Sequence, residues 1–153
     1  YGPGQPADSP YSGVLARFTA QARAGERPEI HGDGGQTRDF VFVGDVVDVL
    51  VLALEQASGD PGGKAFNVGT GRSASISEIW RLVADAAGTD LIPTFGPVRA
   101  GDMRHASADV RSAAELLGFR ARVPLGEGIA RLVGATAGNP DAAPNVRTRE
   151  TAL

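Results

Sequence analysis

The chain has 153 residues, a formal charge of −3 at pH 7 and no cysteine, and it is 42% hydrophobic and 22% charged. This length and composition suit one globular domain, and the acidic balance argues against a nucleic-acid-binding surface. The lack of cysteine excludes disulfides and thiolate zinc sites, and the two histidines, His31 and His105, lie too far apart in sequence to suggest a metal site. No apolar run reaches the roughly 18 residues of a membrane-spanning helix, so we expect a cytoplasmic protein.

The first third of the chain predicts two helices with two strands between them. Apolar residues recur at helical spacing after residue 12, and Gly25 can end that helix. A short strand is expected at 28–31, and the glycine-rich turn that follows leads to a second strand at 37–43. Asp45 stands where it could cap a helix with an apolar stripe of Val46, Val49, Leu50, Ala53 and Leu54.

The rest of the chain predicts two more strands and three more helices. The strands are expected at 65–68 and 91–95, and the helices at 75–87, 109–117 and 124–133. Ser75 and Glu78 have the spacing of a capping box, and Asp109 can cap the next helix. Residues 134–153 are small and polar without periodicity, which favours a mobile tail.

A possible dinucleotide motif lies at residues 69–74, where the sequence G-T-G-R-S-A fits the G-x-G-x-x-A pattern. Such a turn would present backbone N–H groups to a pyrophosphate at a helix N-terminus. However, the capping box places the helix start at Ser75, and no clear strand ending in an acidic residue follows about twenty residues later. We favour a flexible strand-to-helix turn.

The stretch G-D-G-G-Q-T-R-D-F-V-F-V-G-D-V-V at 32–47 resembles a signature of the extended short-chain dehydrogenase/reductase family, the NAD-dependent nucleotide-sugar epimerases and dehydratases. The segments Y-G-P-G-Q at 1–5, F-N-V-G at 66–69 and R-A-G-D-M-R-H at 99–105 match it in the expected order. The resemblance covers about residues 1–133 and is strongest to UDP-glucose 4-epimerases. It implies an α/β fold: the C-terminal portion of a Rossmann-like enzyme, with the small substrate-binding domain and late elements of the parallel sheet, and with most of the cofactor-binding sheet missing.

The same resemblance implies a nucleotide-sugar site. Arg99 and Arg38 match residues that contact the diphosphate, and Asp102 matches the residue that contacts the nucleotide ribose. Glu29 and His31 match the segment that wraps the base. Two further residues, Val14 and Leu15, are expected on the helix that faces the phosphates.

Asp39 and Asp45 could be interpreted as a catalytic carboxylate pair. We favour structural roles for both, with Asp39 pairing with an arginine or a backbone donor. His105 could serve as a general base, but the resemblance implies that it is structural. No catalytic residue is therefore expected within this chain.

The family's catalytic Tyr-x-x-x-Lys is absent, because the only lysine is Lys64 and residue 60 is Asp. We expect NAD to be bound by a missing N-terminal half, and this chain alone to be inactive. We also expect marginal stability, because the helices at 45–56 and 75–87 would expose apolar surface without that half. The expected partners are a nucleotide diphosphate sugar and either the N-terminal half or another protomer. A dehydratase or decarboxylase of the same family, a non-catalytic binding or complementing module, and a degenerate chain without activity remain alternatives.

Overall fold

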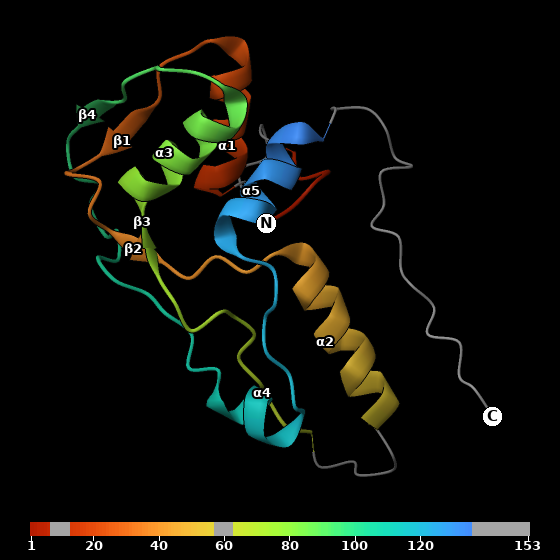
Figure 1. Ribbon diagram of the computed structural model, residues 1–153. Helices are drawn as coiled ribbons and strands as arrows, with labels where there is room; N and C mark the ends of the chain where they lie inside the picture. Colours follow the sequence, from red (N-terminus) through yellow and green to blue (C-terminus); the bar gives the residue numbers. More distant parts are fainter. Residues whose placement is uncertain (7–12, 57–62, 136–153) are drawn as a thin grey trace.

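The computed structural model describes residues 1–6, 13–56 and 63–135. Five helices and four short strands lie in this part of the chain (Figure 1). In chain order they are α1 (Val14–Ala24), β1 (Glu29–His31), β2 (Thr37–Arg38), α2 (Val43–Gln56), β3 (Ala74–Ser75), α3 (Ile76–Ala87), β4 (Thr94–Gly96), α4 (Arg111–Leu116) and α5 (Leu125–Gly134). All but the first two residues of the expected mobile tail at 134–153 lie outside the described residues.

The main core is built around α3, which packs against α1 on one side and α5 on the other. Ile79 and Val83 of α3 are fully buried at helical spacing, and Trp80 packs edge-to-face on Phe18 of α1 with ring centroids 5.4 Å apart. The indole Nε1–H donates to the backbone carbonyl of Leu91 over 3.0 Å, so the buried polar end of Trp80 is satisfied. The expectation that the helix at 75–87 would be left uncovered is therefore wrong.

Local capping signals set the ends of several helices as predicted. The Ser75 hydroxyl accepts from the Glu78 N–H over 3.1 Å and begins α3, while Gly88 ends it in the left-handed conformation. Gly25 ends α1 in the same way, with φ of 69°. Pro124 precedes the first turn of α5, as expected.

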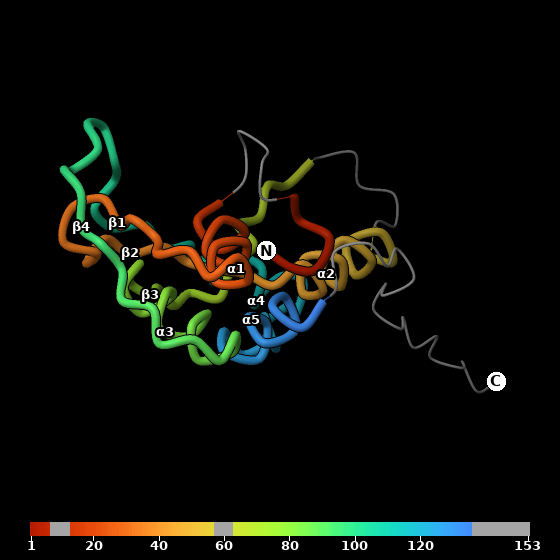
Figure 2. The backbone as a smooth tube through the Cα atoms, turned by 90° about the horizontal axis from the view of Figure 1, so that it is seen from above, coloured from red at the N-terminus to blue at the C-terminus, as the bar shows by residue number. Residues whose placement is uncertain are grey.

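Two small two-stranded sheets position the loops between the helices. β1 and β4 are parallel, with Ile30 opposite Phe95, and β2 and β3 are antiparallel, with Arg38 opposite Ala74. Figure 2 shows both pairs toward one end of the molecule, with α2 extending at the other. An isolated parallel bridge between Thr37 and His105 joins the segment after β4 to β2.

Three strand predictions differ from the structure because a strand needs a neighbour. Pairing at 37–43 ends after Arg38, and the following residues instead pack Phe42 against the ring of Tyr1. Residues 65–68 find no partner strand within the described chain, and Phe66 and Val68 pack onto a small cluster near α4. The strand expected at 91–95 is shifted and pairs only over Thr94–Gly96.

The two aspartates predicted as helix caps differ in their partners. Asp45 lies in the first turn of α2, is 2% exposed, and accepts from the backbone N–H groups of Arg122 and Val123. Asp109 accepts from the backbone N–H of Arg111, the first residue of α4, over 3.1 Å and also ion-pairs with its side chain, although Val110 is the N-cap residue. The hydrogen bonds from Arg111 lower the pKa of Asp109 to about 2.

An apolar stripe on α2 faces solvent in this structure. Its residues recur at the three- or four-residue spacing of one helix face, and their exposed fractions reach 59% at Leu50 and 76% at Leu54. The stripe consists of Val43, Val47, Leu50, Val51 and Leu54. A contiguous apolar surface of this kind marks an interaction site more often than a free surface. For the helix at 45–56, the structure therefore agrees with the expectation of an exposed face.

Candidate functional site

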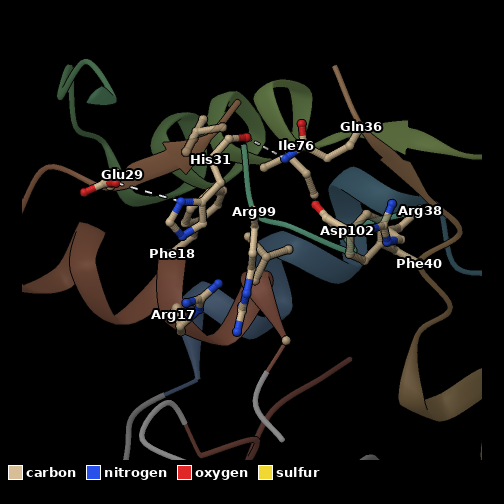
Figure 3. A pocket seen from close by; sticks show the side chains of 13 residues that line it. Arg17, Phe18, Glu29, His31, Gln36, Arg38, Phe40, Ile76, Arg99 and Asp102 are labelled. Carbon is tan, nitrogen blue, oxygen red and sulfur yellow. Dashed lines mark hydrogen bonds and ion pairs between the residues drawn. The ribbon is translucent and has the colours of Figure 1, made fainter. Parts of the chain in front are cut away.

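A cleft of about 290 Å³ lies between the first turn of α1, strands β1 and β2, and the loop that follows β4 (Figure 3). Six residues predicted for the substrate site line it: Val14, Glu29, His31, Arg38, Arg99 and Asp102. Leu15, also expected to face the phosphates, is instead 2% exposed and belongs to the core. The volume is near the lower end of the roughly 300–1,000 Å³ typical of ligand pockets. The structure therefore brings together residues that are as far as 88 positions apart in sequence, from Val14 to Asp102 (102 − 14).

Strand alternation places two of these residues on one side of β1. Glu29 and His31 are two residues apart and lie on the cleft side, while Ile30 between them is 1% exposed and belongs to the core. His31 Nδ1 lies 3.8 Å from Glu29 Oε1. The carbonyl of His31 accepts from Gln36 Nε2 over 2.8 Å, which ties the end of β1 to the start of β2.

Arg38 is held in place by two partners. Its Nη1 donates to its neighbour's carbonyl, Thr37 O, over 2.8 Å, and its Nη2 donates to Asp102 Oδ1 over 2.5 Å. The side chains of Arg38 and Asp102 are both about 30% exposed, so the pair remains in reach of a ligand. Two residues predicted to bind different parts of one ligand therefore bind each other in this structure.

The cleft contains a cation that the sequence analysis did not single out. Arg17 lies three residues after Val14 on the same face of α1 and lines the cleft. Figure 3 shows the side chains of Arg17 and Arg99 directed into the same part of the cleft. Within the described part of the chain, neither has a carboxylate partner. The i, i+3 spacing from Val14 was the signal that could have identified Arg17.

The aspartate and histidine interpreted as structural have backbone or hydroxyl partners. Asp39 accepts from the backbone N–H groups of Thr70, Gly71 and Ala108. His105 Nδ1 lies 3.1 Å from the Thr37 hydroxyl. Of the two kinds of partner expected for Asp39, an arginine or a backbone donor, the structure has backbone donors, and the buried Asp45 has the same kind of role.

The Asp39 carboxylate also bears on whether the G-T-G-R-S-A motif at 69–74 could bind a dinucleotide. It occupies the two backbone N–H groups of the 69–74 turn that a pyrophosphate would need, with N–O distances of 2.9 Å to Thr70 and to Gly71. A Cβ built on Gly69 would lie 2.7 Å from Asp39 Oδ2, so the glycine gives room to this carboxylate. With these N–H groups occupied, the turn is not free to bind the pyrophosphate of NAD. The strand expected before it at 65–68 does not form, so the segment is a loop that leads into β3 and α3.

The described residues include neither a candidate metal-binding cluster nor a candidate membrane-spanning helix. They hold no group of three or more His, Cys, Asp or Glu residues placed to bind a metal ion. None of the helices of this part of the chain is long and apolar enough to cross a membrane.

Comparison with known proteins identifies the family. The model of the NAD dependent epimerase/dehydratase family matches residues 1–69. The UDP-glucose 4-epimerase of Mycolicibacterium smegmatis is 44% identical over 133 residues, which cover 87% of this chain and 41% of the relative. The chain belongs to the NAD dependent epimerase/dehydratase family. It spans about two fifths of the length of this relative.

Solved structures of family members support the fold. UDP-glucose 4-epimerase from Thermotoga maritima, determined with UDP-glucose, has a TM-score of 0.77 and 39% identity, over 87% of this chain and 41% of that one. The Thermus thermophilus UDP-glucose 4-epimerase, determined with NAD, has a TM-score of 0.73 and 33% identity, over 87% of this chain and 42% of the other. The epimerase/dehydratase chain therefore has the α/β architecture of a portion of these Rossmann-like enzymes.

Relatives with other reactions share the same region. UDP-glucuronic acid decarboxylase 4 of Arabidopsis thaliana is 32% identical over 120 residues, which cover 78% of this chain and 26% of the relative. The family assignment therefore rests on a stretch of sequence that is similar in epimerases and decarboxylases.

Proposed function

We propose that this chain is the C-terminal, nucleotide-sugar-binding part of an NAD-dependent epimerase of the UDP-glucose 4-epimerase type. The observation that carries the proposal is the cleft in which the six predicted residues meet together with a further cation, Arg17. The resemblance to UDP-glucose 4-epimerases in both sequence and fold adds to it.

The charges of the cleft suit a diphosphate. Such a group carries about two negative charges and is bound best by arginine forks with several N–H donors. Arg17 and Arg99 are cations without a carboxylate partner in the described structure, and they face the same space. Arg38 would add donors when it exchanges the Asp102 carboxylate for a phosphate oxygen. Asp102, once released, would accept from a ribose hydroxyl.

The rest of the cleft suits a nucleoside. Val14 and Phe18 of α1 and Phe40 after β2 provide apolar contact, and the exposed edge of β1 offers main-chain groups to a base. Glu29 and His31 border this side. In this proposal the chain binds and orients the nucleotide, and the sugar extends toward residues outside the chain.

Hydride transfer at the sugar would require NAD, and the described residues do not provide its site, because Asp39 fills the candidate turn. We therefore propose that a cofactor-binding part outside this chain holds NAD and supplies the catalytic base. The apolar stripe of α2 supports this, because a partner sheet would cover it. Purified chain supplied with NAD and UDP-glucose should form no UDP-galactose, and measurable turnover would contradict this division of roles.

A second candidate is a non-catalytic or complementing module, which the exposed stripe of α2 also favours. Co-expression of the chain with the cofactor-binding portion of the M. smegmatis relative distinguishes the two candidates. A complex with epimerase activity supports the enzymatic role, including that of a complementing module. A complex without activity supports a binding module, and the dehydratase or decarboxylase alternatives are tested by supplying the same complex with dTDP-glucose and UDP-glucuronic acid.

Nucleotide recognition itself can be tested by saturation-transfer NMR with UDP-glucose and, as a control, glucose 1-phosphate. The proposal predicts that the uracil and ribose protons of UDP-glucose receive saturation, whereas glucose 1-phosphate gives a weak signal. Equal signals from the two compounds would refute a site built for the nucleotide.

A further inference from the structure

The loop after β4, residues 97–105, carries Arg99 and Asp102 and has an ion pair to each of two other segments. Asp102 contacts Arg38 of β2, and two residues later Arg104 contacts Asp33 of the turn between β1 and β2. The two pairs therefore join the loop to two different segments, strand β2 and the turn before it. The loop supplies the anion in one pair and the cation in the other.

The Arg104–Asp33 pair has the geometry of a strong ion pair. Arg104 Nη1 and Nη2 donate to the two oxygens of Asp33 over 2.6 and 2.8 Å, so the contact is bidentate. Asp33 Oδ1 also accepts from the Gly35 N–H over 2.9 Å, which orients the carboxylate within its own turn. The hydrogen bonds from Arg104 hold the pKa of Asp33 well below its usual range, with a further contribution from the Gly35 N–H.

The turn is shaped to receive the guanidinium. A Cβ built on Gly35 would lie 2.9 Å from Arg104 Nη2, so a larger residue here would make the guanidinium shift. Gly34, with φ of 72°, takes the left-handed conformation that brings the turn back toward β2. The pairing extends into the backbone, since the N–H of Thr37 donates to the carbonyl of Arg104 over 2.9 Å.

The two ion pairs differ in what a ligand does to them. Arg38 and Asp102 both line the cleft, so a bound diphosphate would compete with Asp102 for the Arg38 fork. Arg104 and Asp33 do not line that cleft, although Arg104 borders a smaller adjoining hollow together with His31, Arg99 and Asp102. A bound nucleotide would therefore weaken the first tether of the loop and leave the second in place.

We propose that Arg104 and Asp33 act as a positioning pair that anchors the 97–105 loop, and with it Arg99 and Asp102, while Arg38 exchanges Asp102 for the ligand. The inference rests on the proposed function for the identity of the ligand. The anchoring of the loop is independent of any ligand, so the two can be tested separately.

The test compares Asp33→Asn, Arg104→Gln and the charge-swapped double variant Asp33→Arg/Arg104→Asp in the full 153-residue chain. Asparagine keeps an oxygen for the Gly35 N–H, so Asp33→Asn removes the ion pair and preserves the turn. Arg81→Gln is the matched control, because it breaks an exposed Arg–Asp pair on α3, remote from the loop.

Two readouts are needed, hydrogen exchange of the peptide 97–106 without ligand and the dissociation constant for UDP. Each single variant should speed exchange of this peptide and weaken UDP binding by about three- to tenfold. The double variant should partly restore the slow exchange and the UDP affinity of the wild type. Arg81→Gln should change neither the exchange rate nor the UDP affinity.

The outcomes separate the two ideas. Unchanged exchange in both single variants overturns the anchor, and faster exchange with unchanged UDP affinity overturns its positioning role. Faster exchange in a chain whose wild-type form binds no UDP supports the anchor and contradicts the proposed function.

Discussion

Replacing Ile79 by alanine tests where the stability of this chain resides. Ile79 is 0% exposed and lies on α3 between α1 and α5, so truncation leaves a cavity that the two flanking helices cannot readily fill. Substitutions of this kind cost about 2–5 kcal/mol, and a central value of about 3 kcal/mol with an m-value of about 2 kcal/mol/M lowers the urea midpoint by about 1.5 M. Against a total stability of about 5–15 kcal/mol, this is a large loss.

The matched variant is Leu50→Ala on the exposed stripe of α2. Leu50 is 59% exposed, so the same change of side-chain type should alter the free energy of unfolding by no more than about 0.5 kcal/mol. Both variants can be followed by the fluorescence of Trp80, the single tryptophan, which is buried in the core next to Phe18. If Leu50→Ala costs as much as Ile79→Ala, the stripe of α2 is covered in the isolated chain, and our division between a closed core and an open face is wrong.

Three further predictions follow from individual contacts. Gly69→Ala should destabilise the chain by about 1–3 kcal/mol in urea unfolding, because the new Cβ would collide with the Asp39 carboxylate, and a cost below 0.5 kcal/mol would contradict the tight approach. Arg17→Gln should weaken UDP binding several-fold in a fluorescence titration, whereas Arg81→Gln on the surface of α3 should leave it unchanged; equal affinities would remove Arg17 from the site. The lowered pKa of Asp33 means that its pair with Arg104 stabilises the fold above the ordinary carboxyl pKa and that this contribution is lost only as pH falls through the lower folded value. Carbon-13 NMR should therefore show Asp33 titrating below the ordinary carboxyl range, and closer to that range in Arg104→Gln, where only the Gly35 N–H bond remains; ordinary titration in the wild type would refute the ion pair.

Helix ends were the most predictable part of the fold, because their causes are local. Ser75 can bond the N–H of Glu78 whatever the rest of the chain does, and Gly25 and Gly88 adopt left-handed φ at little steric cost. These signals depend on a few neighbouring residues and can therefore be read from the sequence. The same logic failed at Asp45, since the partners of its carboxylate lie 77 and 78 residues away.

Strands were less predictable because their extent is set by a partner. Residues 37–43 have the composition of a strand, yet pairing stops after Arg38, which lies opposite Ala74, the first residue of β3. Residues 65–68 are similar, and the described chain offers them no neighbour. The expected marginal stability of the whole chain stays a prediction, although the closed packing of α3 removes one of its two premises.

The site was predicted by resemblance rather than by periodicity or charge. Family motifs led to Arg38, Arg99 and Asp102, and the structure brings them into one cleft. No local rule could reveal that Arg38 and Asp102 bind each other, because 64 residues separate them. Arg17 was missed for a different reason: an arginine on a helix is by default a solvated surface charge.

The most direct test of the central claim is isothermal titration calorimetry of the chain with UDP, UDP-glucose and dTDP-glucose, with Arg99→Ala as the control. Arg99 lines the cleft without a carboxylate partner among the described residues, so alanine should remove a charged contact to the diphosphate and leave the fold intact. A charged hydrogen bond of this kind is worth about 1.5–3 kcal/mol, which corresponds to at least a tenfold loss of affinity. The account predicts UDP and UDP-glucose binding that falls by at least this factor in Arg99→Ala. Binding of equal strength in the two proteins, or no binding of any nucleotide by the wild-type chain, would contradict it.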